Sequence, residues 1–321
     1  MSTIEVRPFR RSDRDQLTQL VNAHAAAVVP GMSASVSAVL ASLERRPGEF
    51  IVDPWVSERV TLIAEQADRV AAAAHLLRFF PDERAGLAAR NSGEIHWLLF
   101  WPEAPASNPY WPDSRPAADA LIHACIEQLE EWEVTSQDAG GELPVRGVYG
   151  VPEQWPHVSA LYADAGFVHI GHTEIVYLAR VADLPRPAVA PIPGLAVRRA
   201  VGMNGVRFSA VVSDEVIGYV EVEVFDDGER LTRQGGWADV GNLRVAAPYR
   251  RRGVGSWLLG QAAEWLSLAG VDRLLDYAWL EGTDPGGIDY ADQRAFLPAV
   301  GFRELTRTRR GWARDVLGAP R

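Results

Sequence analysis

The residues whose types and spacing could do chemistry follow an apolar strand in the last third of the chain. That strand ends at Leu243 and Val245, and the turn after it holds Arg250, Gly253 and Gly255. Glycine has no Cβ, so an anion can approach the backbone closely there. The first turn of a following helix leaves N–H groups without internal partners, and these can bind a phosphate. The pattern predicts a pyrophosphate site, to which three consecutive arginines add positive charge.

Other readings of this turn differ in how well the sequence fits them. A basic turn with two glycines could simply connect a strand to a helix. A nucleotide P-loop needs Lys-Ser or Lys-Thr after its glycine, and this turn has neither. A dinucleotide-binding turn needs a third glycine where this chain has Leu258.

The motif resembles the hallmark of the GNAT superfamily of acyl-CoA-dependent N-acyltransferases, which is Arg/Gln-x-x-Gly-x-Gly/Ala after a central strand. A second resemblance is the segment Ala295–Phe302, because family members usually end their last helix in a similar Gly-Phe sequence. The resemblance implies an α/β (α+β) fold with a mixed, mostly antiparallel sheet flanked by helices. It also implies acetyl-CoA as co-substrate, no metal, and cofactor contacts from Leu243, Arg244, Val245, Arg250, Arg251, Arg252, Gly253, Val254, Gly255 and Ser256.

The chain reads as the same unit twice. Ile4–Phe9 and Leu195–Ala200 are similar openings, and Ala160–Phe167 and Ala295–Phe302 are similar endings. We therefore expect two tandem GNAT-like domains: a degenerate copy over 1–183, a Pro-rich linker over 184–194, and an acetyl-CoA-binding copy over 195–321.

Each copy has lost a different part. The first has Trp101–Pro112 where the phosphate loop belongs, and its prolines lack N–H groups, so we expect it to bind no acyl-CoA. The second has about eight residues between Arg198 and its next strand, too few for the two helices that normally wall the acceptor side. We expect the first copy to supply that wall, which would place the acceptor cleft near the interface between the domains.

A base must remove a proton from the acceptor amine. Many family members carry Glu six residues before the terminal Val of the central strand, and Asp239 stands there. Glu223, with Glu221 beside it, is the reserve, and His96 of the first copy is a further candidate. The usual general acid of the family is a Tyr four residues before the closing Gly.

That position is Leu297 in the second copy, whereas the first copy keeps Tyr162. Tyr290 and Tyr277 are the candidates to replace the missing hydroxyl. The departing thiolate could also take its proton from water.

Composition narrows the class of protein. No apolar run approaches the length of a membrane span, and a single cysteine, Cys125, makes no internal disulfide, so a cytoplasmic protein is expected. A net charge of −10 argues against nucleic acid as partner. All 32 basic residues are arginine, so no lysine can act as nucleophile.

Together these patterns predict an N-acetyltransferase that moves an acetyl group from acetyl-CoA to a primary amine of a small molecule. The chain could act alone or as a homodimer. Two alternatives remain open: acetylation of a protein N-terminus or lysine, and a non-catalytic acyl-CoA-binding module. The second alternative is motivated by Leu297 in place of Tyr.

Overall fold

The computed structural model describes residues 3–45, 54–102, 113–145, 147–203, 205–224, 236–282 and 289–315. The chain divides into two compact units. The first holds the residues up to Thr173 together with those from Arg307 onward, and the second holds Glu174–Thr306. Within the described ranges, no helix is long and apolar enough to cross a membrane.

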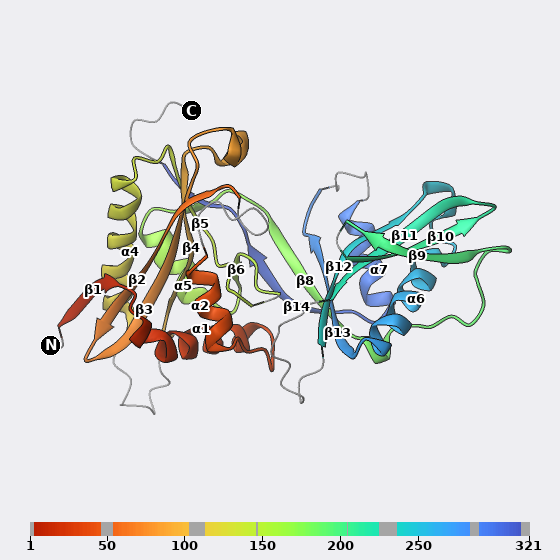
Figure 1. Ribbon diagram of the computed structural model, residues 1–321, viewed down its shortest axis with the longest axis horizontal. Coiled ribbons are helices and arrows are strands. Elements are labelled where there is room, and N and C mark those ends of the chain that lie inside the picture. The colour runs from red at the N-terminus through yellow and green to blue at the C-terminus, as the bar shows by residue number, and fades with distance from the viewer. Residues whose placement is uncertain are drawn as a thin grey trace. The chain divides into compact units, whose positions relative to one another are not determined.

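The first unit is built around a seven-stranded sheet in the order β1-β2-β3-β4-β5-β15-β7. Its strands are β1 (Ile4–Pro8), β2 (Val56–Gln66), β3 (Arg69–Phe79), β4 (Ser92–Phe100), β5 (Ser136–Ala139), β7 (Val168–His169) and β15 (Trp312–Arg314). Its helices are α1 (Arg14–Val28), α2 (Val36–Leu43), α3 (Gly86–Ala89), α4 (Arg115–Glu131) and α5 (Pro156–Asp164). Helix α4 packs along β1–β4, while α1 and α2 lie on the other side of the sheet (Figure 1).

The second unit holds most of an eight-stranded sheet in the order β6-β14-β8-β13-β12-β11-β10-β9. Its strands are β6 (Val151–Pro152), β8 (Thr173–Arg180), β9 (Ala196–Gly202), β10 (Gly205–Val212), β11 (Glu215–Val224), β12 (Gly236–Val245), β13 (Val271–Trp279) and β14 (Arg303–Arg309). The helices are α6 (Val254–Leu268) and α7 (Tyr290–Ala299). Helix α6 packs against β10–β13, and α7 packs against β13.

Both sheets are mixed and mostly antiparallel, as predicted. Strands β4 and β5 pair in parallel, as do β12 and β13. Strand β9 pairs directly with β10, from Gly202 opposite Gly205 to Ala196 opposite Val211. The second copy therefore goes from its first strand to its second with no helices between them, whereas α1 and α2 follow β1 in the first unit.

The compact units do not end where the sequence repeat suggests. Strand β8, from the end of the first repeat, pairs antiparallel with β13 of the second unit. Strand β15, from the end of the chain, pairs with β5 and β7 of the first unit. The predicted boundaries, 1–183 and 195–321, therefore differ from the compact units, because a strand's pairing partner depends on tertiary contacts. They remain a prediction about how the sequence repeats.

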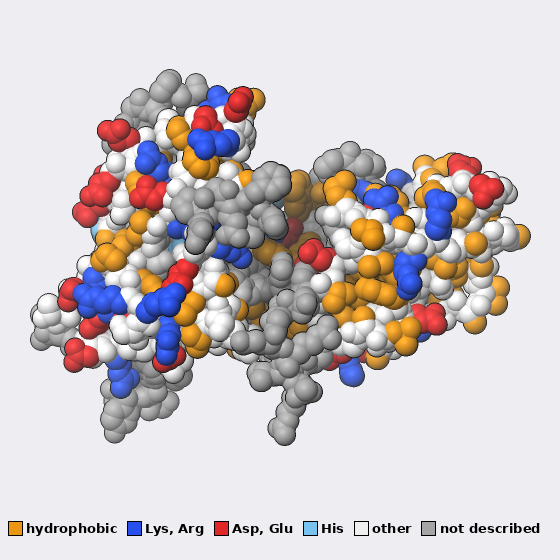
Figure 2. Space-filling view, viewed as in Figure 1, with side chains coloured by type: hydrophobic (Ala, Val, Ile, Leu, Met, Phe, Trp, Pro, Cys, Tyr) orange, Lys and Arg blue, Asp and Glu red, His pale blue; other side chains and the backbone are white. Residues whose placement is uncertain are grey.

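The Pro-rich segment 184–194, predicted as a linker, packs on the second unit. Leu184 and Ile192 are buried in that unit's hydrophobic core. The carbonyl of Pro185 lies so near Gly260 of α6 that a Cβ there would be 2.8 Å away. On the visible face of each unit, basic and acidic side chains are interspersed, and neither kind forms a large patch of its own (Figure 2).

Candidate functional site

Strands β12 and β13 separate part of the way along their length. Their parallel pairing runs from Gly236 to Asp239, which lies opposite Leu275, although both strands continue beyond that point. On its other side β12 stays paired with β11 as far as Val245. A bulge at Gly241 occurs where the separation begins, since Glu221 pairs with Asn242 and Val222 with Val240. A bulge bends a strand and increases its twist, which opens a wedge beside residues 240–245.

The turn that follows β12 leads into the N-terminus of α6. Gly253 caps this helix with φ of 82°, a left-handed conformation that favours glycine. Gly255 has a packing reason as well: a Cβ there would lie 3.3 Å from the ring of Phe296 on α7. The Arg250 side chain donates from Nε to the Val245 carbonyl at 3.0 Å, which ties the turn to the strand.

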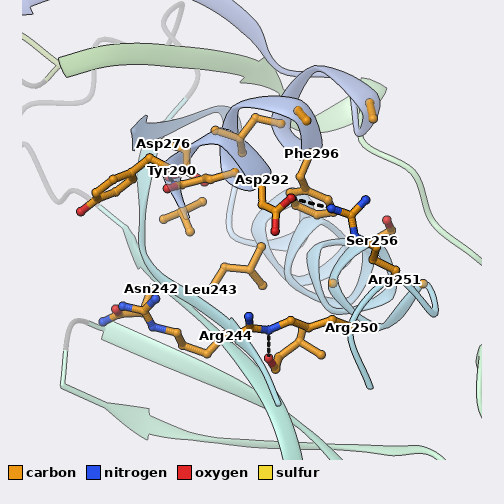
Figure 3. A pocket seen from close by; sticks show the side chains of 18 of the residues that line it. Asn242, Leu243, Arg244, Arg250, Arg251, Ser256, Asp276, Tyr290, Asp292 and Phe296 are labelled. Carbon is orange, nitrogen blue, oxygen red and sulfur yellow. Dashed lines mark hydrogen bonds and ion pairs between the residues drawn. The ribbon is translucent and has the colours of Figure 1, made fainter. Parts of the chain in front are cut away.

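A cavity of about 630 Å³ fills the wedge and reaches the turn. Its wall is formed by the end of β12, the turn, the start of α6, part of β13 and one side of α7 (Figure 3). Leu243 points into it, while Arg251 and Asp292 form an ion pair across from the start of α6 to α7. The unpaired first turn of α6, the arginines and this volume together suit a phosphate-bearing ligand with an extended arm.

Most of the predicted cofactor contacts meet at this cavity. The lining residues among them are Leu243, Arg244, Val245, Arg250, Arg251, Gly253, Gly255 and Ser256. Arg252 does not line it, and its guanidinium lies 5.8 Å from the centre of the Tyr249 ring. The Val254 side chain is buried in the core instead, because it faces the sheet from the first turn of α6.

The predicted bases lie away from the cavity wall. Asp239 accepts a hydrogen bond from the Tyr277 hydroxyl at 3.0 Å and does not line the cavity. Glu223 is exposed on β11 opposite Asp239. Glu221 is fully buried and accepts hydrogen bonds from Arg207 and from the Met203 N–H. Burial raises the Glu221 pKa, but these hydrogen bonds outweigh it and the pKa is lowered, so Glu221 is held as a structural carboxylate.

The candidates for the missing hydroxyl are partly engaged elsewhere. Leu297 lines the cavity as a fully buried apolar side chain. Tyr290 also lines it, its ring packing 5.3 Å from that of Trp279, and burial raises the pKa of its hydroxyl. His96, the further candidate for the base, lies in the first unit, where its Nδ1 is 3.4 Å from Glu94 Oε1.

Two acidic residues line the cavity that the sequence did not single out, Asp276 and Asp292, and Asp276 is the buried one. Asp276 lies on β13, is 4% exposed, and lines the cavity. A signal was available, because alternate residues of a strand share a face. Leu274 and Ala278 on either side of it belong to the hydrophobic core, so a carboxylate between them marks a special position. Burial raises the pKa of Asp276 to about 7.

Comparison with known proteins gives a family match that falls on the second unit. Residues 183–295 match the model of the acetyltransferase (GNAT) family. That stretch contains β9–β13, the turn after β12 and α6. A search of curated proteins found no match.

Solved structures resemble the chain over nearly its whole length. A tandem GNAT protein from the clavulanic acid biosynthesis pathway has a TM-score of 0.63 at 15% identity, covering 97% of this chain and 98% of that one. A GCN5-related N-acetyltransferase from Sphaerobacter thermophilus has a TM-score of 0.57 at 14% identity, covering 97% and 95%. A glucosamine N-acetyltransferase region of a fungal multi-domain enzyme scores 0.60 at 14% identity, and this chain covers 38% of it. At identities of 14–15%, these likenesses show a shared fold and nothing more specific.

Proposed function

We propose that this protein transfers the acetyl group of acetyl-CoA to a primary amine of a small molecule, since residues 183–295 match the model of the GNAT acetyltransferase family, whose members use an acyl-CoA co-substrate. The observation that carries the proposal is the wedge between β12 and β13, which opens onto the N-terminus of α6. One end of this single cavity suits a diphosphate and the other end suits a thioester arm.

The backbone of β12 supports this assignment. Beyond Asp239 the strand keeps its bonds to β11 but leaves the pairing with β13. Backbone polar groups on that side of residues 240–245 are therefore directed at the cavity, where an amide-containing chain can pair with them as an added strand. An N–H among them that reaches the thioester oxygen would stabilise the negative charge that develops there during attack.

The anion end of the cavity supports acetyl-CoA independently. The first turn of α6 offers N–H groups and the positive end of the helix dipole. Arg250 and Arg251 line the same end. Residues 186–321 hold 18 Arg against 17 Asp and Glu, whereas residues 1–185 hold 14 Arg against 25 Asp and Glu, so the negative charge lies in the first part of the chain. A polyanionic co-substrate is thus favoured at this end.

The test is acetyl transfer measured by thiol release from acetyl-CoA. The amine panel comprises 2-phenylethylamine, putrescine, glucosamine, glycine and a peptide that carries both a free N-terminus and a lysine. Turnover with a small amine, and little with the peptide, is the expected result. Peptide-only turnover would favour a protein acceptor. Calorimetric binding of coenzyme A without any turnover would favour a binding module.

The position of the acceptor cleft and the oligomeric state remain predictions. The first copy as a wall for the acceptor is the sequence-based hypothesis, motivated by the direct β9–β10 connection. Deletion is unsuitable as a test because strands are exchanged between the repeats. Crosslinking of a photoreactive amine substrate, followed by peptide mapping, would identify which residues contact the acceptor.

A further inference from the structure

Asp276 has an unusual environment for a carboxyl group in a cavity wall. Its Oδ1 accepts hydrogen bonds from the Tyr277 N–H at 2.8 Å and from Gln293 Nε2 at 3.2 Å. Its Oδ2 is buried and has no hydrogen-bond partner among the described residues. A buried carboxylate oxygen without a donor is costly, so such an atom in a cavity wall indicates a ligand or a proton as its partner.

The groups that face Asp276 come from three other elements. Burial is the largest influence and raises its pKa to about 7, and the carboxylates of Asp239 on β12 and Glu174 on β8 act in the same direction. The Tyr277 N–H and Gln293 of α7 oppose this rise. A carboxyl group with these neighbours exchanges its proton near neutral pH, which is the property that a general base or acid requires.

The remaining acid–base groups in the wall are less suited to this task. Asp292, the other carboxylate of the lining, is paired with Arg251 and 56% exposed. The lining residues of the described cavity include no histidine or cysteine. The position at which the family resemblance expects a tyrosine hydroxyl is the apolar Leu297.

We propose that Asp276 is the proton-transfer residue of the acetyl transfer, taking the proton from the acceptor amine and returning it to the departing thiolate. This inference rests on the proposed function and adds a residue and a role to it. It moves the base from Asp239, which accepts a hydrogen bond from the Tyr277 hydroxyl and does not line the cavity, to a carboxyl that does.

The proton balance of the step closes with this one residue. The amine nitrogen forms a bond to the thioester carbonyl carbon while Asp276 accepts one proton from that nitrogen. The carbon–sulfur bond then breaks, and sulfur leaves with the electron pair. Asp276 returns the proton to sulfur, so that an amine and a thioester become an amide and a thiol, and the carboxylate is restored.

The principal test compares Asp276→Asn with Asp272→Asn, an exposed position on the same strand. The amide oxygen of Asn can still accept from Tyr277 and Gln293, so the fold should be kept. With the best panel amine, kcat/KM of Asp276→Asn should fall about 100-fold or more, the usual scale for a lost general base. Asp272→Asn should stay within about twofold of the wild type, as expected for an exposed position.

The pH dependence separates proton transfer from mere positioning. The ratio of wild-type to Asp276→Asn kcat/KM cancels the ionisation of the amine itself. That ratio should rise as pH passes upward through about 7, because only ionised Asp276 can accept a proton. A large loss of activity with a ratio that does not change with pH would mean that Asp276 only positions other groups, and would overturn the proposal.

Two further measurements guard against a misfolded variant. Asp276→Ala should regain at least tenfold in rate with added formate, a small carboxylate, whereas absence of rescue would count against proton transfer. Thermal stability gives a readout without substrate. The pKa of Asp276 is higher in the native state than in the unfolded state, so the wild type loses stability as pH rises from about 4 to 7. Asn does not titrate and has no such loss. The Tm of Asp276→Asn should therefore exceed that of the wild type increasingly from pH 5 to 8.

The outcomes also distinguish this inference from the proposed function. An active wild type together with an Asp276→Asn variant of near-normal kcat/KM would overturn the role of Asp276 and leave the acetyltransferase assignment standing. A wild type that acetylates none of the panel amines would overturn the proposed function and this role with it. A Tm difference that is constant across pH would contradict the titration of Asp276 near 7.

Discussion

The two units share one arrangement of strands but differ in what occupies the space beside it. In each, a bulged strand runs parallel to the next one, β4 beside β5 and β12 beside β13. The bulge falls at His96 in the first unit and at Gly241 in the second. Aligned on their bulges, Glu94 corresponds to Asp239 and Ala139 to Asp276.

The strand ends beyond the bulge are filled in one unit and open in the other. Residues 97–100 of β4 are buried, whereas residues 242–245 of β12 are half-buried and line the cavity. Fully buried Tyr162 donates its hydroxyl to the Gly140 carbonyl at 2.9 Å. Leu297, at the corresponding position of the second copy, has no hydroxyl and cannot make such a hydrogen bond.

The backbone differs too: in the first unit the Gly140 and Glu142 N–H groups after β5 donate to the Ile95 and His96 carbonyls of β4, whereas the pairing of β12 with β13 ends at Asp239. The difference teaches that a ligand space opens only where the two parallel strands separate.

The largest expected effect comes from filling the open wedge. Leu243→Trp places an indole in the cavity into which Leu243 points. Coenzyme A affinity should fall about 100-fold, which corresponds to roughly 2.8 kcal/mol. The control is Val201→Trp on edge strand β9, where the side chain is 92% exposed. Equal coenzyme A affinity in the two variants, measured by calorimetry, would contradict the cavity as binding site.

The next effect concerns the turn that caps α6. Gly253→Ala forces a Cβ into a left-handed conformation, 3.3 Å from Pro191, and should lower the free energy of unfolding by about 1–2 kcal/mol. Gly282→Ala has a similar φ of 96° but no atom within 4 Å of the new Cβ. Urea unfolding gives the free energy of unfolding of both variants, and the difference between their losses is the part due to the contact with Pro191. Coenzyme A binding should weaken in Gly253→Ala alone.

A smaller effect is expected from the arginines. Arg251→Ala should raise the KM for acetyl-CoA about three- to tenfold, because an exposed charged contact contributes about 1 kcal/mol. Arg252→Ala should raise it less, since Arg252 does not line the cavity. The Arg251 effect should also shrink at high ionic strength. A larger effect for Arg252, or one independent of salt, would reverse the assignment of these two residues.

The smallest effect belongs to the filled unit. Tyr162→Phe removes the hydroxyl bonded to Gly140 and should cost about 1 kcal/mol of stability, seen as a lower urea midpoint. Acetyl transfer should be unchanged, because this hydroxyl serves packing in the first unit. A loss of turnover greater than the loss of stability explains would give Tyr162 a functional role.

Local signals in the sequence predicted the two copies and the turn that leads into a helix in the second. Helix α6 starts directly after Gly253, as the glycine turn indicated. Residues 168–180 hold two strands, β7 and β8, which lie in different sheets. Partner choice of that kind depends on contacts far apart in the chain, so periodicity carries no information about it.

The sequence predicted the turn of the candidate site but not all of the residues that face it. The turn from Arg250 to Ser256 has a spacing that reflects backbone geometry, and the structure brings most of it to one cavity. The reasons for its glycines are partly tertiary, since Gly255 faces Phe296 from another helix. The position of Asp276 between the core residues Leu274 and Ala278 was a local signal, but its raised pKa comes from burial beside Asp239 and Glu174, which depends on tertiary contacts. Residues 103–112, on which the prediction of a blocked first copy mainly rested, lie outside the described residues.

The stoichiometry of coenzyme A binding tests the central claim most directly, because it asks whether one wedge or both are open. Calorimetric titration of the wild-type chain should give one coenzyme A per chain, and Leu243→Trp should weaken that binding about 100-fold while the fold persists. Two molecules per chain, or one that binds Leu243→Trp with wild-type affinity, would contradict the account.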